Sequence, residues 1–360
     1  MIIQRLELVD FRNYSAATFE LTPGTTVVVG DNGQGKTNLT EAIAYLATLG
    51  SFRGVGADAL VRFGAAVSIV RAEIRDDDGR QSLIEAEITP SGRGRVQVNR
   101  QRLARTRDLL GIVRVTVFSP DDLALVKGGP ADRRRFMDDA LVALATKHDE
   151  MRLELDRILR QRNNLLRQVG GRLDADAART LDVWDDKLAA TGEQFGRARA
   201  ALIERATPHI TAAYARLAGQ TASIVVTYAP HWRGDGGLAA ALAKARTDDL
   251  RRGVSTVGPH RDELDLQLGA MPARTHASQG EQRTLALALR LGVHHLVTEH
   301  TGSTPVLVLD DVLSELDARR AAALLEMLPG GQVVITTAGA IPSTATPERV
   351  IRIARGAIID

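Results

Sequence analysis

The stretch with the clearest chemical meaning is residues 30–37, Gly-Asp-Asn-Gly-Gln-Gly-Lys-Thr. It fits the pattern G-x-x-x-x-G-K-[ST], in which glycines let the backbone wrap a phosphate and a lysine reaches the β- and γ-phosphates of a nucleotide. We therefore expect Lys36 to contact phosphate and the Thr37 hydroxyl to bind Mg²⁺. The alternative is a glycine-rich turn that fits the pattern by chance, and the flanking residues decide between the two.

Those flanking residues predict the strand–loop–helix setting that the motif needs. Residues 25–29, Thr-Thr-Val-Val-Val, form an apolar β-branched run typical of a buried strand. Residues 38–46 carry apolar side chains at helical spacing, which predicts a helix over 36–48. In this setting the loop N–H groups and the helix N-terminus point at negative charge, so the motif predicts nucleotide binding.

A second candidate for phosphate chemistry is a pair of carboxylates. The apolar run 305–309 predicts another buried strand, and it ends in Asp310 and Asp311. An acid at a strand end beside a phosphate loop can hold Mg²⁺, the role that suits Asp310. Asp311 is then placed to polarise the water that attacks the γ-phosphate. Loops after strands are often acidic, so the pair alone is weak evidence for a catalytic role. The phosphate loop in the same chain is what makes that role the better interpretation.

A third segment of interest lies between these two motifs, directly before a predicted helix over 283–297. It is residues 277–282, Ala-Ser-Gln-Gly-Glu-Gln. Ser278 and Gly280 at a helix N-terminus can form another anion-binding cradle. The alternative is an ordinary helix cap, because Ser278 and Glu281 stand at capping-box spacing.

Composition restricts the remaining possibilities. A chain of 360 residues can form two core-bearing units, or one large domain with another inserted into it. The absence of cysteine excludes disulfides and thiolate metal sites, which suits a cytoplasmic location. No apolar run approaches the about 20 residues that span a membrane, so we expect no membrane partner. With a net charge of +2, a nucleic-acid partner must be inferred from local patches.

Alternation and turn residues predict short strands in the first third of the chain, at 2–8, 16–21, 25–29, 66–76, 81–89, 93–98 and 113–118. Two heptad seams follow, from Met137 to Val169 and from Leu181 to Leu202, with a glycine turn at 170–171 between them. We expect them to form an antiparallel hairpin of roughly 60 Å that ends before Pro208. Over 131–218 there are 16 basic and 14 acidic residues, which favours a packing or partner surface over a basic rod.

In a nearly neutral protein, the window 93–107 stands out as the sharpest local positive patch. It contains six arginines and no acid: Arg93, Arg95, Arg100, Arg102, Arg105 and Arg107. One interpretation is a surface for nucleic-acid phosphates, and the other is a solvated strand and loop in an arginine-rich chain. Arg133 to Arg135, at the start of the helical region, are a second candidate for DNA contact.

The order of these motifs resembles the ABC-type ATPase heads of the SMC/Rad50 class, and within it the RecF family of bacterial recombinational repair proteins. Residues 30–37 stand as Walker A, 278–282 as the signature, 309–311 as Walker B and 314–317, Ser-Glu-Leu-Asp, as the D-loop. Further motifs that fit the family run in order from the N-terminus to about residue 340: 11–14, 35–42, 119–123, 129–136, 258–262 and 309–317. The segment 258–262 is a glycine–proline turn that carries one titratable histidine, His260, and by itself it is equally compatible with a functional role and with a mere turn into the next strand.

The resemblance implies an α/β fold. It is an ABC-type P-loop ATPase head with an added antiparallel β subdomain and an inserted helical lobe, a short antiparallel coiled coil. We expect the head in two halves, 1–130 and 253–360, with the helical lobe at 131–252 between them.

The resemblance also implies a weak, DNA-stimulated ATPase that uses ATP and Mg²⁺ as a switch. Two heads would form an ATP-dependent homodimer in which Ser278 of one chain reaches the nucleotide of the other. The implied partners are double-stranded DNA and its junctions with single strands, RecR and RecO, which help load RecA. The implied catalytic residues are Asp311, Lys36 and Ser278, with Thr37 and Asp310 as metal ligands. The implied nucleotide-binding residues are Gly30, Asp31, Asn32, Gly33, Gln34, Gly35, Lys36, Thr37, Asn38, Arg12, Ser278, Gly280 and Gln282.

Two positions depart from the ABC pattern. Ala338 stands where a histidine usually follows the strand after Walker B, and Ser119 stands at the end of the candidate strand where a glutamine is usual. Both departures favour a switch over a fast motor. The main alternative is the nucleotide-binding subunit of an ABC transporter, which would need a membrane partner and would not need the helical arm.

Overall fold

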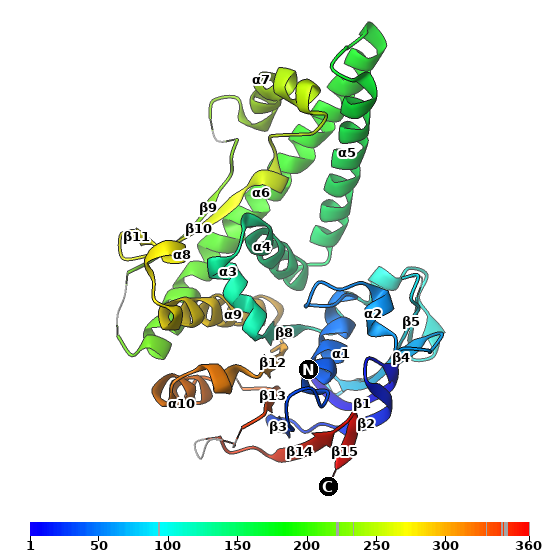
Figure 1. Ribbon diagram of the computed structural model, residues 1–360, viewed down its shortest axis with the longest axis vertical. Coiled ribbons are helices and arrows are strands. Elements are labelled where there is room, and N and C mark those ends of the chain that lie inside the picture. The colour runs from blue at the N-terminus through cyan, green and yellow to red at the C-terminus, as the bar shows by residue number, and fades with distance from the viewer. Residues whose placement is uncertain are drawn as a thin grey trace. The chain divides into compact units, whose positions relative to one another are not determined.

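The computed structural model describes residues 1–92, 94–220, 223–232, 234–328, 330–339, 341 and 345–359 (Figure 1). The chain forms two compact units. The first, the head unit, consists of Met1–Leu123, His209–Thr221 and Ser278–Asp360. The second, the arm unit, consists of Ala124–Pro208 and Ala222–Ala277. Compared with the expected boundaries, residues 124–130 and 253–277 group with the arm, and residues 209–221 group with the head.

The core of the head unit is a six-stranded sheet in the order β15-β14-β3-β13-β12-β8. Its strands are β3 (Thr25–Val29), β8 (Val115–Phe118), β12 (Val306–Asp310), β13 (Val333–Thr337), β14 (Arg349–Ala354) and β15 (Ala357–Ile359). All neighbours pair in parallel except β14 and β15. β12 and β13 are buried along their whole length, as their continuous apolar sequences predict. The parallel register brings the carboxyl ends of β3, β12 and β13 to one edge of the sheet.

A second, antiparallel sheet in the order β2-β1-β4-β5-β6-β7 forms the predicted β subdomain of the head. Its strands are β1 (Ile2–Phe11), β2 (Tyr14–Glu20), β4 (Ser68–Arg75), β5 (Gln81–Ile88), β6 (Arg95–Val98) and β7 (Gln101–Arg102). Alternate residues such as Leu6, Leu8, Val70 and Ala72 are fully buried, so one face packs on the core and the other is polar. Helix α1 (Lys36–Thr48) contacts strands of both sheets.

The remaining helical segments of the head are α2 (Ala57–Leu60), η1 (Thr106–Leu109), η2 (Pro120–Leu123), α9 (Gln279–Thr301), η4 (Val312–Glu315) and α10 (Ala318–Glu326). Helix α9 is the long helix that begins at the signature, and most of its residues from Gln282 to Val297 are buried, on all sides of the helix. Helix α9 begins at Gln279, directly after its N-cap Ser278. Its start therefore lies four residues before residue 283, where the sequence predicted it.

The arm unit consists of helices around a small sheet in the order β11-β10-β9. Its elements are α3 (Ala124–Lys127), α4 (Pro130–Leu144), α5 (Lys147–Val169), the part of α6 (Ala175–Ala218) up to Pro208, β9 (Ile224–Ala229), α7 (Gly237–Arg252), η3 (Pro259–Arg261), β10 (Glu263–Leu268), β11 (Met271–Pro272) and α8 (Ala273–His276). The antiparallel pair of α5 and α6 is the predicted hairpin, and Leu155, Ile158, Leu188 and Phe195 on its seams are buried (Figure 1).

The hairpin differs from the prediction in two respects. The first seam is not one helix, because Ala145 adopts an extended conformation between α4 and α5, and the 23 residues of α5 give an arm of roughly 35 Å instead of 60 Å. Pro208 does not end α6, which continues to Ala218. The buried side chains Ala206 and Ile210 flank the proline, and the Thr207 hydroxyl donates to the Ile203 carbonyl oxygen. Packing on both sides holds the helix through the proline.

Buried polar side chains fix the turn 258–262 within the arm. His260 Nε2 donates to the Ser255 carbonyl oxygen at 3.0 Å, and burial lowers the pKa of His260 to about 4, so this histidine is neutral. Asp262 accepts hydrogen bonds from the Tyr228 hydroxyl and the His231 N–H group. The described contacts of this motif are structural. Among the described residues, none of the helices is long and apolar enough to cross a membrane.

Candidate nucleotide-binding site

The phosphate loop, residues 30–37, connects β3 to α1 at the carboxyl edge of the parallel sheet. Gly35 caps α1 with φ = 119°, and a Cβ at this position would lie 2.8 Å from the Tyr14 hydroxyl. Only glycine fits this turn without strain. The Lys36 ammonium donates to the carbonyl oxygens of Gly30 (2.7 Å) and Asp31 (3.0 Å), and the residue is 5% exposed. Asp31, Asn32 and Gly33 form the exposed crest of the loop.

Two distant segments hold the phosphate loop, and no motif in the sequence marks the second of them. From the β1–β2 turn, the Asn13 amide donates to the Gln34 carbonyl oxygen at 3.0 Å, and the Asn38 amide donates to Asn13 Oδ1 at 2.8 Å. From the β14–β15 turn, the Arg355 N–H donates to Gln34 Oε1 and the Gly356 N–H donates to the Gln34 carbonyl oxygen. Gln34 and Asn38 therefore brace the loop.

Arg12 lies beside the loop but is bound to α1. Its Nε and Nη2 groups donate to the two carboxylate oxygens of Glu41, both at 2.7 Å, and the Ser51 hydroxyl also donates to Glu41. Glu41 is fully buried, so this bidentate pair neutralises a carboxylate that would otherwise be costly to bury. Nη1 of Arg12 is not used by Glu41.

Asp310 occupies the end of β12 and is 2% exposed. The Thr336 hydroxyl, from the neighbouring strand β13, donates to Asp310 Oδ1 at 2.7 Å. The hydroxyls of Thr37 and Thr40 also lie within hydrogen-bonding reach of the Asp310 carboxylate, and burial nevertheless raises the pKa of Asp310. The structure therefore brings the predicted metal ligands Thr37 and Asp310 together.

Asp311 follows in a left-handed conformation, with φ = 51°. Its N–H donates to the Thr336 hydroxyl at 3.0 Å, and the Ser314 hydroxyl donates to the Asp311 carbonyl oxygen at 2.7 Å. A non-glycine residue in this region costs on the order of 1 kcal/mol, and here the neighbouring bonds enforce it. Asp311 Oδ1 is buried and has no hydrogen-bond partner among the described residues.

These groups fit Mg²⁺ and a nucleotide phosphate. A buried, desolvated carboxylate and a threonine hydroxyl supply oxygen ligands, which Mg²⁺ prefers. The orphaned Oδ1 of Asp311 is an acceptor that a water or a ligand group would satisfy. Thr37 and Asp310 are the residues that would hold the ion, and Lys36 would supply a cation next to the phosphates.

The signature segment lies in the same head unit but is not bonded to the phosphate loop. Ser278 is exposed and caps α9: its N–H and hydroxyl donate to Glu281 Oε2, both at 2.8 Å, and these bonds lower the pKa of Glu281. Gly280 approaches Arg320 of α10, to which a Cβ would come within 2.7 Å. Gln282 is buried. Both interpretations of Ser278 remain compatible, because a capping hydroxyl that is exposed is also accessible to a second chain.

Near the two departures from the ABC pattern, neighbouring residues form hydrogen bonds and ion pairs within the head. Ser119 N–H donates to Asp122 Oδ2 at 2.9 Å after β8, and Arg290 of α9 pairs with Asp122 at 2.6 Å. Before Ala338, Thr336 binds both Walker B acids, as described above. No pattern in the sequence marks Thr336, because its role follows from the pairing of β13 with β12.

The candidate DNA contacts fare differently. Arg93 lies outside the described residues. Arg95 pairs with Glu87 (2.7 Å) and Arg105 with Asp108 (3.0 Å), while Arg100 and Arg102 are exposed. Arg133 is 6% exposed and pairs with Glu263 at 2.6 Å, so it supports the arm from within.

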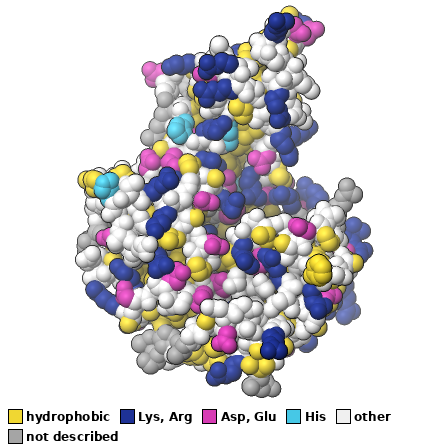
Figure 2. All heavy atoms as spheres, in the orientation of Figure 1, with side chains coloured by type: hydrophobic (Ala, Val, Ile, Leu, Met, Phe, Trp, Pro, Cys, Tyr) yellow, Lys and Arg dark blue, Asp and Glu magenta, His cyan; other side chains and the backbone are white. Residues whose placement is uncertain are grey.

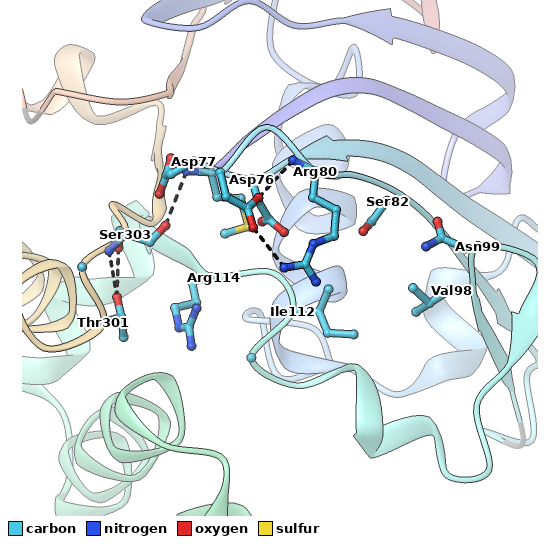
Figure 3. A pocket seen from close by; sticks show the side chains of 14 residues that line it. Asp76, Asp77, Arg80, Ser82, Val98, Asn99, Ile112, Arg114, Thr301 and Ser303 are labelled. Carbon is cyan, nitrogen blue, oxygen red and sulfur yellow. Dashed lines mark hydrogen bonds and ion pairs between the residues drawn. The ribbon is translucent and has the colours of Figure 1, made fainter.

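A separate polar cleft of about 570 Å³ opens between the β4–β5 turn and the end of α9 (Figure 3). None of its lining residues belongs to the predicted nucleotide site. Two of its three acids are engaged within the fold: Asp77 pairs with the Met1 amino group, and Asp78 pairs with Arg80 at 3.0 Å. Arg80 and Arg114 line the same cleft.

Comparison with known proteins places this site in a family. Residues 2–355 fit the family model described as "RecF/RecN/SMC N terminal domain". The DNA replication and repair protein RecF of Streptomyces avermitilis is 47% identical over 354 residues, covering 94% of both chains. RecF of Frankia alni is 43% identical over 379 residues, covering 100% of this chain and 99% of its own. The chain belongs to the RecF family.

Solved structures agree with this assignment to the RecF family. A structure described as the recombination mediator protein RecF-ATP in the RecFOR pathway matches with a TM-score of 0.91 and 29% identity, covering 99% of this chain and 96% of its own. A structure described as the Smc head bound to the C-winged helix domain of ScpA matches with a TM-score of 0.59 and 16% identity, covering 99% of this chain and 96% of its own, and it supports the fold alone. The predicted ABC-type head, β subdomain and inserted helical lobe are confirmed. The RecF family consists of replication and repair proteins, so the transporter alternative is not supported.

Proposed function

We propose that this protein is an ATP-dependent DNA-binding protein of recombinational repair and replication recovery that acts in the cytoplasm. ATP would drive two heads together, and the dimer would clamp duplex DNA near single-strand gaps and help RecO and RecR load RecA. Slow, DNA-stimulated hydrolysis would reset the switch. The observation that carries the proposal is the contact between Thr37 of Walker A and the buried Asp310 of Walker B, in a chain of the RecF family.

The head residues divide the work as follows. Lys36 and the loop N–H groups hold the β- and γ-phosphates, and Gly35 allows the close approach of the backbone. Mg²⁺ held by Thr37 and Asp310 would neutralise charge on these phosphates. Asp311, through the unpartnered Oδ1, orients the attacking water and accepts its proton. Asn38 and Gln34 keep the loop in position.

Three further groups approach the nucleotide in this proposal. Ser278 and Gly280 of one chain face the γ-phosphate bound by the other, and Gln282 supports them from the buried side of α9. Arg12 contributes the Nη1 group that Glu41 does not use. A carboxylate pair braced by neutral hydroxyls, without a histidine after β13, suits slow turnover below about 1 s⁻¹, the low end of enzyme rates.

The test is fluorescence anisotropy with a labelled duplex at fixed salt. Binding is measured without nucleotide, with ATP and Mg²⁺, and with ATP and Mg²⁺ for Ser278→Arg. Ser91→Arg, an exposed serine in the β5–β6 turn, is the matched control for the added charge. We expect ATP to tighten binding about tenfold, a change of about 1.4 kcal/mol. Ser278→Arg should abolish that gain, and Ser91→Arg should keep it.

DNA binding that ignores ATP would contradict the switch, and so would a Ser278→Arg variant that keeps the full gain. Sedimentation of the same samples adds an independent measurement, because the dimer should form with ATP in wild type and in Ser91→Arg but not in Ser278→Arg.

A further inference from the structure

The near-balance of charge over residues 131–218 conceals a strong segregation along the arm. From Arg157 to Arg172 the chain contains five arginines and no acid. One of them, Arg162, is fully buried, and the other four are exposed: Arg157, Arg160, Arg167 and Arg172. Acidic residues cluster instead in the first part of α6, where Asp182, Asp185 and Asp186 lie.

The exposed arginines of α5 share one side of the helix. Arg157, Arg160, Asn164 and Arg167 follow one another at spacings of three and four, which places them in one stripe. The ten residue steps from Arg157 to Arg167 span about 15 Å along the helix axis. Leu155, Ile158, Leu159 and Leu166 occupy the buried side. The stripe is therefore a fixed surface, because the opposite side of the helix is packed.

Helix α7 adds two more cations at the end of this stripe. Gly253, the C-cap of α7, lies against Arg167, whose Cγ would be 3.1 Å from a Cβ there. Arg251 and Arg252 immediately precede it and are exposed. The anchor is Arg162, which donates at 2.7 Å to both Asp185 of α6 and Asp249 of α7. This buried network fixes α7 beside α5, so the two groups of arginines form one surface.

We name this surface the arm face and define it by Arg157, Arg160, Arg167, Arg172, Arg251 and Arg252. Dark blue side chains follow the arm where Figure 1 draws α5 (Figure 2). Within the described residues, Arg160, Arg172 and Arg252 have no ion pair. Arg157 is 67% exposed and 3.6 Å from Glu154, and Arg251 is 70% exposed and 2.9 Å from Asp248. Exposed pairs of this kind contribute about 0–1 kcal/mol, so they do not block another anion.

The chemistry of the arm face selects its ligand. Between Arg157 and Arg172 the stripe has no exposed large apolar side chain, whereas the centre of a protein interface or a membrane-binding helix needs one. The spaces between arginines hold the amides of Gln161, Asn164 and Gln168, all exposed, which can donate to phosphate oxygens. A repeating anion with little sequence information fits this surface.

We propose that the arm face binds the phosphate backbone of duplex DNA. The inference rests on the proposed DNA-binding function and assigns a contact surface to it. The arm, whose net charge is close to zero, then adds affinity for DNA of any sequence. The six arginines act together, because each phosphate that they neutralise releases counterions from the DNA.

The test compares two triple variants in the full-length protein with ATP and Mg²⁺. The first is Arg160→Gln with Arg167→Gln and Arg252→Gln. The matched control is Arg179→Gln with Lys187→Gln and Arg197→Gln, three exposed cations of α6. Duplex affinity is measured by anisotropy between 50 and 200 mM salt, concentrations chosen because counterion release of about 0.9 per phosphate contact governs the slope there.

We expect the arm-face variant to bind about 10- to 50-fold more weakly, with a slope of log affinity against log salt reduced by about 2 to 3, and the control to change by less than about threefold. ATPase activity without DNA and the ATP-driven dimer should be unchanged in both. Equal slopes for variant and control, in a wild type that binds DNA, would overturn the inference and leave the proposed function intact. A wild type that binds no DNA defeats the proposed function itself. Loss of the dimer in the arm-face variant, with the monomer's DNA binding unchanged, would show instead that a second copy occupies the surface.

Discussion

The nucleotide site and the arm face hold their charges in opposite ways. In the head, Lys36 and Asp310 are 5% and 2% exposed, and each is held by neutral carbonyl or hydroxyl groups in fixed positions. On the arm face the guanidinium groups are exposed and their ion pairs are weak. Buried charges interact strongly and are not screened, whereas exposed charges are screened over about 10 Å at 0.1 M salt. In the head, the loss of a single charged or hydrogen-bonding group should therefore have a large effect on nucleotide binding or hydrolysis. On the arm face, the loss of DNA affinity should instead grow with the number of arginines removed.

The largest effect should come from Lys36→Met, which keeps the stem and removes the ammonium. Loss of a charged hydrogen bond to phosphate of about 1.5–3 kcal/mol should weaken ATP binding up to about 100-fold. The measurement is titration with a fluorescent ATP analogue. Lys187→Met, an exposed lysine of α6, is the control and should bind ATP normally. If Lys36→Met binds ATP within threefold of wild type, the buried Lys36 ammonium does not determine ATP affinity.

Thr336→Val tests whether neutral hydroxyls in the head matter as much as charges. The substitution preserves the shape and removes the donor to Asp310 and the acceptor for the Asp311 N–H group. An unsatisfied buried group costs about 1–3 kcal/mol, so hydrolysis should slow by about 10- to 100-fold while ATP affinity changes little. Steady-state ATPase assays over a range of Mg²⁺ concentrations measure the effect. Thr336→Ser should restore most of the rate; if it is as slow as the valine variant, the hydroxyl is not responsible.

Asp310→Asn should trade activity for stability. Burial raises the pKa of Asp310 in the folded protein, so the folded state keeps this proton to higher pH than the unfolded state does. Its contribution to stability is present below the ordinary aspartate pKa and is lost as the pH rises through the raised pKa. At neutral pH the asparagine variant should therefore melt higher, by about 2–4 °C for each kcal/mol, and the difference should shrink in acid. Calorimetry without nucleotide at several pH values measures the two melting temperatures. An Asp310→Asn variant that melts at or below the wild-type temperature at neutral pH would contradict the prediction.

The smallest effects distinguish two arginine-rich stretches. Arg160→Gln on the arm face should weaken duplex binding a few-fold and reduce the salt slope by about 1. Arg95→Gln should change neither, because two guanidinium nitrogens of Arg95 donate to Glu87 of the adjacent strand, which is only 24% exposed, whereas the pairs on the arm face have single contacts between more exposed groups. Anisotropy at several salt concentrations measures both. A larger loss for Arg95→Gln than for Arg160→Gln would reverse the assignment of the two stretches.

These two stretches also show where sequence reasoning ends. Both windows, 93–107 and 157–172, contain several arginines and no acidic residue. In the first, the fold brings acids next to Arg95 and Arg105: Glu87 comes from the neighbouring strand and Asp108 from the following turn, while Arg100 and Arg102 stay exposed. In the second, helical spacing turns Arg157, Arg160 and Arg167 toward solvent, and Arg172, which follows the helix, is exposed as well. Acids that lie across a strand pair are invisible in a window, so the window alone cannot distinguish a neutralised surface from a basic one.

The nucleotide site was predictable to the extent that its chemistry is local. The phosphate loop and the Asp310–Asp311 pair are contiguous motifs at strand ends, and the parallel sheet brings them together as expected. The brace from Arg355 to Gln34 joins residues 321 positions apart, and no local pattern predicts it. The break between α4 and α5 was also missed, since neither Ala145 nor Thr146 is a residue that ends helices by itself.

The order of strands in the head sheet has a consequence for synthesis. β3, which leads into the phosphate loop, pairs with β13 and β14, so its partners emerge more than 300 residues after it. At ribosomal rates of 5–20 residues per second, its valines wait roughly 15 to 65 s for those partners. The arm unit, complete by Ala277, can form meanwhile. Within this window the nascent head exposes an apolar strand, which makes it a client for chaperones that shield such segments during translation.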